Sequence, residues 1–259
     1  MSVAALLLGD SRFPAGGHAH SGGVEPAVTA RTVTDLSTLE AFLRGRLRTA
    51  GLVAAGIAAA ACLHAREADQ IPETSRRGES AELVRDEYWA CLDAEADART
   101  PSPAQREASR RQGRALLRAA RVAWPEAAGL AALAPSAKAR AAGAPSGAAR
   151  SRAATGGPHH AIVLGAAAAA AGCAPVEAAR IAAYQAVAGP VSAAVRLLAL
   201  DPMRATGVLA RLAGEIGQWA EAGAAFADGP LSDLPCASAP ALDLLAEAHI
   251  NAEVRLFES

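Results

Sequence analysis

The densest group of residues that could do chemistry lies near the start of the chain, in the stretch GDSRFPAGGHAHSGGVE from Gly9 to Glu25. It combines five glycines and a proline with two serines, two histidines, an aspartate, an arginine and a glutamate, whereas most of the remaining sequence is rich in alanine. Three kinds of chemistry are open to such a stretch: a serine nucleophile, a metal site, or a surface that binds another protein.

The Gly-Asp-Ser sequence that ends at Ser11 is similar to the nucleophile block of GDS-type serine esterases. In this alternative Ser11 is the nucleophile, and Asp243 and His249 late in the chain assist it. A serine hydroxyl does nothing without a base within hydrogen-bond reach, and that esterase fold needs parallel strands around the serine. The sequence has no run that predicts such strands, so we expect a protein that is not an enzyme.

The metal alternative depends on His18 and His20, with Asp10 or Glu25 as further ligands. Two imidazoles two residues apart in a glycine-flanked loop can bind Ni²⁺, Cu²⁺ or Zn²⁺. The spacing fixes no third ligand, and a structural role for the two rings competes with this alternative. His18 and His20 are therefore the weak metal candidates of a chain in which we expect no resident cofactor. The four cysteines form no CxxC pair, which indicates buried thiols in a reducing compartment.

Composition excludes several classes of protein. The net charge is −1, so nothing points to nucleic acid. The longest apolar run, residues 162–176, is too short and too weakly hydrophobic to span a membrane. The first residues lack a basic segment followed by an apolar one, so we expect a cytoplasmic protein. Phosphate-binding, dinucleotide-binding and HExxH sequences are absent.

The elements that position the first loop are expected to be helices. Leu36, Leu39, Leu43 and Leu47 repeat at helical spacing, and no run alternates with the period of a strand. The sequence therefore predicts an all-α fold: a single domain over 1–259, built as a bundle of about eight to ten helices. Alanine buries little area, so the helices must approach closely, and a thin core favours extra burial through self-association.

The predicted helices run over about 36–63, 81–98, 103–124, 159–172 and 176–188, then from 190, from 202 and from 242 through Phe257. The arginines between Arg106 and Arg121 are expected to form a solvated helix face. Two stretches, about 69–80 and 135–158, are expected to be flexible loops, because they carry few bulky apolar side chains that a fold could bury.

The stretch LLLGDSRFPAGGHAHSGGVE closely resembles the N-terminal signature of the UreF family of urease accessory proteins. The matching positions are Asp10, Ser11, Pro14, Gly16, Gly17, Ser21, Gly23 and Glu25. Further similar stretches follow in the family's order over nearly the whole chain: STLEAFLRGRLRT, DARTPSPAQREASRRQGRALLR, GPHHAIVLGAAAAAAG, VSAAVRLLALDP and HINAEVRLFES. The version looks closest to the actinobacterial branch of the family.

The chain also departs from the family pattern. Many members carry aromatic residues and serine where this chain has His18 and His20, so a metal role for these two imidazoles is not a family property. The usual Gly-Gln after an arginine-bearing helix is Asp201-Pro202 here.

The resemblance implies an all-α, dimeric, cytoplasmic chaperone of nickel-enzyme maturation. Such a protein bridges a UreD (UreH)-type scaffold and the UreG GTPase, and the complex helps to deliver nickel to apo-urease, handling the metal transiently. In the family, a C-terminal tail docks into the scaffold and becomes ordered there, and by position that tail is residues 249–259. On sequence alone, Phe257 could equally anchor a partner or pack on its own domain. The candidate partner-binding residues are Arg12, Phe13, Pro14, Gly16, Gly17, His20, Ser21, Gly23, Glu25, His249, Arg255, Leu256, Phe257 and Ser259.

Overall fold

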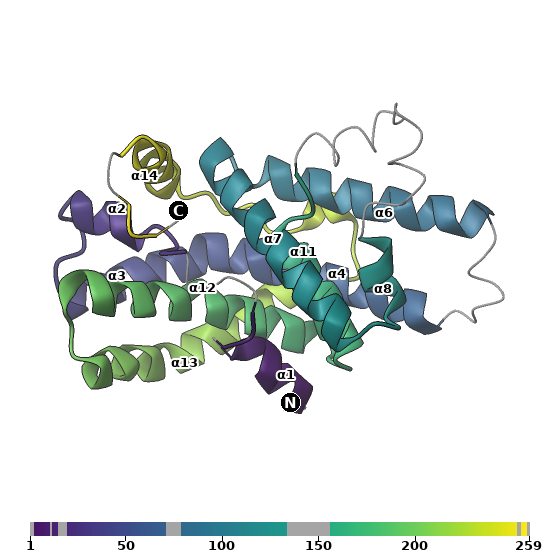
Figure 1. Ribbon diagram of the computed structural model, residues 1–259, viewed down its shortest axis with the longest axis horizontal. Helices are drawn as coiled ribbons and strands as arrows, with labels where there is room; N and C mark the ends of the chain where they lie inside the picture. The colour runs from purple at the N-terminus through teal and green to yellow at the C-terminus, as the bar shows by residue number, and fades with distance from the viewer. Residues whose placement is uncertain are drawn as a thin grey trace.

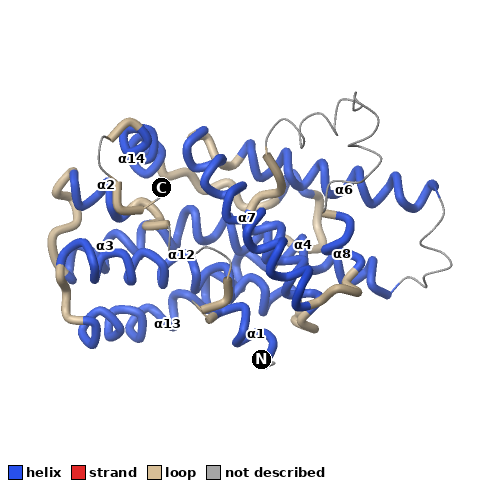
Figure 2. Tube along the Cα trace, viewed as in Figure 1, coloured by secondary structure: helices blue, strands red, loops and turns tan. Residues whose placement is uncertain are grey.

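A computed structural model describes residues 3–10, 12–14, 20–70, 79–133, 156–252 and 255–257, with the side chains described from residue 86 onward in the fourth range. Most of the two predicted flexible loops, 69–80 and 135–158, lies outside these ranges. Within the described residues the regular elements are all helical (Figure 2), which confirms the predicted all-α class. That residues 1–259 form one domain stays a prediction.

The helices follow one another in a simple order along the chain (Figure 1). Their bounds are α1 (Val3–Gly9), α2 (Val24–Thr29), α3 (Leu36–Arg46), η2 (Leu47–Gly51), α4 (Leu52–Gln70), α6 (Glu79–Ala98), α7 (Pro103–Ala123), α8 (Ala128–Ala132), α11 (His160–Ala170), α12 (Pro175–Leu198), α13 (Pro202–Ala224), η3 (Leu231–Asp233) and α14 (Pro240–Ile250). The π-helical segment η2 joins α3 and α4 into one continuous helix, Leu36–Gln70.

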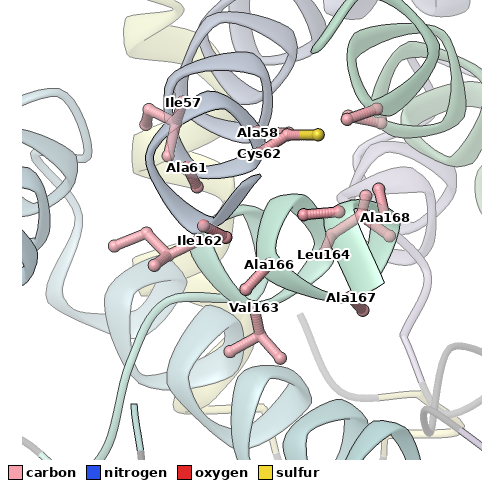
Figure 3. Close-up of a cluster of buried hydrophobic side chains, with 14 of the residues drawn as sticks. Ile57, Ala58, Ala61, Cys62, Ile162, Val163, Leu164, Ala166, Ala167 and Ala168 are labelled. Carbon is pink, nitrogen blue, oxygen red and sulfur yellow. The ribbon is translucent and has the colours of Figure 1, made fainter. Parts of the chain in front are cut away.

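Helix α4 lies at the centre of the molecule and packs against α11, α12 and α13, while α7 covers the other side of α11 (Figure 1). Most of the buried side chains on α4 and α11 are alanine, as Figure 3 shows for Ala58 and Ala61 of α4 facing Ile162 and Leu164 of α11. Side chains this small let two helix backbones come close, as the alanine-rich composition predicts. The core therefore gains its packing from short distances rather than from bulky residues.

Two of the helices are long and apolar enough to cross a membrane by length and composition alone: Leu36–Gln70 and Pro175–Leu198. Both are core helices of the bundle, and 61% and 44% of their most apolar windows are buried inside the protein. Their apolar character is accounted for by the neighbours against which they pack.

The start of three helices is fixed by side chains that the sequence offers for capping. The carboxylate of Asp35 accepts the backbone N–H groups of Ser37 and Thr38, and Thr38 completes the capping box. Ser102 caps α7, and Asp201 caps α13 ahead of Pro202. The Asp-Pro pair that replaces the family's Gly-Gln thus has a local role, because a capping side chain followed by proline is a strong helix start.

Helix α12 corrects one prediction from the sequence. Two separate helices were expected to meet near Pro190, but α12 continues through this residue without a break. Proline has no N–H, so the carbonyl of the residue four positions earlier loses its helical partner. Here that carbonyl belongs to Ala186, and Nε of Arg46 on α3 donates to it at 2.9 Å. A side chain from another helix replaces the missing hydrogen bond.

The arginine-bearing helix α7 corrects a second prediction. Arg110 does not face solvent; its side chain is only 3% exposed. Its Nη1 lies 3.1 Å from Oδ1 of Asp93, and its Nη2 lies 3.0 Å from Oδ2 of the same residue. Nη2 also lies 2.8 Å from Oδ2 of Asp97, and both aspartates are on α6. Arg110 and Arg114 also donate to carbonyls of the segment before α11, at Gly157 and Gly156. Two residues of the arginine row, Arg110 and Arg114, thus connect α7 to neighbouring parts of the protein: Arg110 to α6, and both to the segment before α11.

The last helix corrects a third prediction, because α14 ends at Ile250 instead of continuing through Phe257. The backbone N–H of Ala252 bonds to the carbonyl of His249 at 3.1 Å, which turns the chain away from the helix axis. Residues 255–257 then return toward α2 (Figure 1), where the functional candidates gather.

The close packing of α4 and α11 yields a prediction at Gly165. A Cβ atom on Gly165 would collide with the carbonyl oxygen of Ala58 and lie 2.9 Å from the backbone nitrogen of Cys62. Because the backbone of α4 cannot give way cheaply, Gly165→Ala should lower the free energy of unfolding by about 1–3 kcal/mol. Urea denaturation followed by circular dichroism measures this change.

Gly214→Ala is the matched control, because nothing lies within 4 Å of a Cβ at this exposed helical position. It should raise the free energy of unfolding by up to about 1 kcal/mol through helix propensity alone. Equal effects of the two substitutions would contradict the proposed role of close packing.

Candidate functional site

The first loop and the C-terminal segment meet at the carboxylate of Glu25. Its Oε1 accepts the backbone N–H of Leu256 at 2.7 Å, and its Oε2 accepts that of Phe257 at 2.8 Å. Glu25 is buried, so its charge depends on these donors rather than on water. The structure therefore brings together two predicted candidate regions that are more than two hundred residues apart in the sequence.

His249 closes the same contact from α14. Its Nε2 lies 3.4 Å from Oε2 of Glu25 and 3.2 Å from the carbonyl oxygen of Phe257. Both of these atoms are acceptors, so Nε2 must carry a proton. His249 thus holds the end of the C-terminal segment while it faces the carboxylate that binds the segment's N–H groups.

The ring of Phe257 packs on its own chain. It is 9% exposed, and the guanidinium carbon of Arg196 on α12 lies 5.9 Å from the ring centroid, within range of a cation–π contact. Of the two possibilities left open for this residue, the structure places the ring on its own domain. The two residues before Phe257 are exposed instead: Leu256 is 73% exposed, and Arg255 is exposed as well.

Ser21 and the glycines after it set the direction of Glu25. The hydroxyl of buried Ser21 accepts the N–H of Glu25 at 3.3 Å and so begins α2. Gly23 has φ +89°, and a Cβ there would lie 3.3 Å from Leu242 of α14. A side chain at Gly23 would be strained and would also press on the helix that carries His249. The Ser-x-Gly-x-Glu spacing is therefore a compact helix start that points a carboxylate at the tail.

The earlier part of the first loop contains both buried and exposed candidate residues. Phe13 is buried, and its ring centroid lies 6.2 Å from that of Trp124. Arg12 is exposed, and its Nη2 pairs with Asp10 at 2.8 Å. Hydrogen bonding to Arg12 lowers the pKa of Asp10 below its ordinary value. Pro14 is exposed beside them.

The remaining candidates divide between a cavity and the undescribed residues. His20 is buried and lines a cavity of about 950 Å³ that also touches Phe257. Ser11, Gly16, Gly17, His18 and Ser259 lie outside the described residues, so the structure does not place the predicted serine nucleophile or the His18–His20 pair. Within the described residues no group of three or more His, Cys, Asp or Glu side chains is arranged to hold a metal ion.

Asp243 and His249 do not form the pair that the esterase alternative needs. The polar contacts of His249 are with Glu25 and Phe257. Asp243 comes six residues earlier on α14 and therefore lies on a different face of the helix. Burial raises the pKa of Asp243 above its ordinary value, and this carboxylate lines the cavity. Of the two described members of this constellation, His249 thus holds the tail and Asp243 lines the cavity.

A serine, a histidine and an aspartate do meet elsewhere, at a place that only the His159-His160 pair marks in the sequence. Nε2 of His159 lies 2.9 Å from Oδ1 of Asp97, and its Nδ1 lies 3.0 Å from Oγ of Ser109. Because a carboxylate only accepts, Nε2 carries the proton and Nδ1 accepts the serine hydroxyl. The same Ser109 oxygen accepts the N–H of His160 at 3.2 Å and caps α11. These hydrogen bonds connect the start of α11 to α6 and α7.

Two neighbouring histidines are held neutral. Burial, and then the charge of Arg110, lowers the pKa of His159, against the opposing hydrogen bond to Asp97. Burial, and then the proximity of His20, lowers the pKa of His160 to about 4. Both rings face the protein interior and the cavity wall rather than bulk water.

The Glu25 contact predicts the behaviour of Glu25→Gln. The amide oxygen of glutamine can accept one of the two backbone N–H groups, but its NH₂ group cannot accept the other. Losing one charge-assisted bond and weakening the second should open the segment locally, so that the amides of Leu256 and Phe257 exchange at least about tenfold faster. Hydrogen exchange read by mass spectrometry on a peptide spanning 251–259 measures this.

Glu215→Gln is the control for that experiment, because Glu215 is also a charge-paired carboxylate but lies on α13 and pairs with Arg44 and Arg48 rather than with the tail. It should leave exchange in 251–259 unchanged. Tail exchange that is the same in wild type and Glu25→Gln would show that the carboxylate does not hold the segment.

The two neutral histidines predict a pH dependence of stability. Their pKa values in the folded protein lie below the ordinary 6.5, so the unfolded chain takes up protons first. The free energy of unfolding should therefore fall as the pH drops from about 6.5 toward 4. Replacing His160 by Gln removes one titrating group and should flatten the dependence of Tm on pH in this window only. Parallel curves for the two proteins would contradict this assignment.

Comparison with known proteins gives a consistent result. The family model UreF matches residues 33–213. The urease accessory protein UreF of Mycolicibacterium vanbaalenii is 42% identical over 256 residues, which cover 98% of this chain and 97% of that protein. The UreF of Mycobacterium marinum is 41% identical over 254 residues, covering 98% and 97% of the two chains. The UreF of Mycobacterium tuberculosis strain H37Rv is 42% identical over 262 residues, covering 100% and 99%. The chain therefore belongs to the UreF family of urease accessory proteins.

Proposed function

We propose that this protein is a non-enzymatic adaptor in urease maturation. It bridges a UreD (UreH)-type scaffold and the UreG GTPase, acts as a homodimer in the cytoplasm, and supports the delivery of nickel to apo-urease. Nickel is cargo of the assembled complex in this proposal and has no resident site here. Membership of the UreF family is the observation that supports the proposal most strongly.

The C-terminal segment supports the docking part of the proposal. Exposed side chains on a backbone that is already ordered favour binding, because ordering a segment on binding costs affinity. The contacts of Glu25 and His249 hold residues 255–257 against the body, while Leu256 and Arg255 stay exposed. We infer that these two side chains, rather than the buried Phe257 ring, meet the scaffold directly.

Exposed apolar residues at the other end of the chain support association with further subunits. Val3, Leu6 and Leu7 share the outward face of α1, while Ala5 and Leu8 face inward. Apolar residues on one exposed face commonly mark a protein contact. This face is a candidate for the self-association that makes the dimer.

The proposal predicts the result of mixing purified components. The protein, a UreD-type scaffold and a UreG-type GTPase should elute together as one larger species in size-exclusion chromatography with light scattering. Deleting residues 253–259 should remove the scaffold from that peak. An unchanged peak would count against the docking role of the tail but not against family membership.

A point variant makes the same test without loss of the tail. Leu256→Ala should weaken scaffold binding by about 2 kcal/mol if this residue is an anchor. Leu244→Ala is matched in chemistry and exposure, at 72% against 73%, but lies on α14 outside the tail. It should leave scaffold binding unchanged, as measured by isothermal titration.

A further inference from the structure

Arg46 is the last residue of α3 and lies on the wall of the large cavity, between the first loop and α12. A Cβ on Gly22, which has φ +60°, would lie 3.3 Å from both Cζ and Nη2 of Arg46 and 2.9 Å from the ring of Pro190. The glycine therefore lets the first loop pass directly over the guanidinium. The π-helical turn η2 begins at the next residue, and such turns are frequent at functional sites.

The described residues use only one of the five N–H donors of this guanidinium. Nε donates to the carbonyl of Ala186, the group that Pro190 leaves without a helical partner. Within the described residues, no hydrogen bond engages either Nη atom and no carboxylate pairs with Arg46. Its neighbours on the same helix differ, since Arg44 and Arg48 both pair with Glu215.

Arg46 is partly buried. A cation that is partly withdrawn from water and lacks a counter-charge is unfavourable, because the hydration it loses is not replaced by an ion pair. Burial is the sole cause that lowers the pKa of Arg46, to about 10, so the side chain is still charged at neutral pH. The described part of the chain thus keeps a positive charge beside a cavity and satisfies only its Nε.

The other charges on the cavity wall do not neutralise Arg46. Asp10 is engaged by Arg12, and Asp243 lies on α14. Arg196 and Arg99 add positive charge to the same wall. The guanidinium of Arg99 is occupied by carbonyls of the segment 231–235 and by Glu95. Among the described arginines of this wall, Arg46 combines a committed Nε with two Nη groups that no described residue engages, whereas the guanidinium of Arg196 lies over the ring of Phe257.

We propose that the cavity binds a small oxyanion at the two Nη groups of Arg46. With Nε already committed to Ala186, the pair of Nη groups presents two parallel N–H donors, the geometry that suits two oxygens of a phosphate or a carboxylate. The Gly22 turn and the Pro190 ring border the site and keep it narrow. This site is independent of the proposed adaptor function, and each can fail without the other.

Calorimetric titration of the full chain with inorganic phosphate, and separately with acetate, tests the proposal at constant ionic strength set with chloride. Wild type should bind one of the two anions with one-to-one stoichiometry, and the tighter one identifies the ligand class. Arg46→Gln keeps a donor for the Ala186 carbonyl but loses the charge, and should bind at least tenfold more weakly. Arg211→Gln, which removes a surface arginine paired with Glu40, should bind as wild type does.

Equal affinity in wild type and Arg46→Gln, or no binding of either anion, would overturn the proposal. If Arg46→Gln does not fold, wild type alone gives the answer through modification by phenylglyoxal. The bound anion should slow the modification of Arg46 at least tenfold, as mapped by mass spectrometry, while that of Arg211 is unaffected. An unchanged rate at Arg46 would likewise overturn it.

Discussion

The close approach of neighbouring helices to α4 is the constraint on which the rest of this structure depends. An alanine-rich core stabilises a fold only if backbones pack at short range, and at Gly165 the backbone of α11 meets the carbonyl of Ala58 with no room for a methyl group. Such a core has few large side chains whose shapes could specify one arrangement. The relative orientation of the helices must then be set by interactions other than the packing of large side chains.

Charged side chains that are buried or partly buried supply much of that orientation. Arg110 joins α7 to α6 and to the segment before α11, Arg46 joins α3 to α12, and Glu25 joins α2 to the C-terminal segment. In each case a charged group binds backbone atoms of another element, so that a shift of one helix would leave it without partners. Breaking such contacts is costly because it strands a charge away from water. The alanine-rich core therefore brings the helices close together, and these polar contacts set how the helices are oriented.

Much of the fold was predictable from the sequence, and much of the site was not. Helical periodicity and capping residues located α3 and α7 closely, because these signals are local. The continuation of α12 through Pro190 was missed, since its stabilising donor, Arg46, comes from a distant helix. The spacing around Glu25 marked an unusual stretch, but no local pattern shows that its carboxylate binds the backbone of residues 256 and 257. Likewise, the exposure of Leu256 beside a buried Phe257 follows from that tertiary contact alone.

The bond between Glu25 and Leu256 has a consequence for the order of events during synthesis. The two residues are 231 positions apart, so at about 5–20 residues per second the carboxylate waits roughly 10 to 50 s on the ribosome before its donors are made. Throughout that time the start of α2 has a carboxylate without its donors and cannot settle in its final form. The first loop therefore reaches its final form only after residues 256 and 257 have been made, and a chain that stops before them would not present the finished surface.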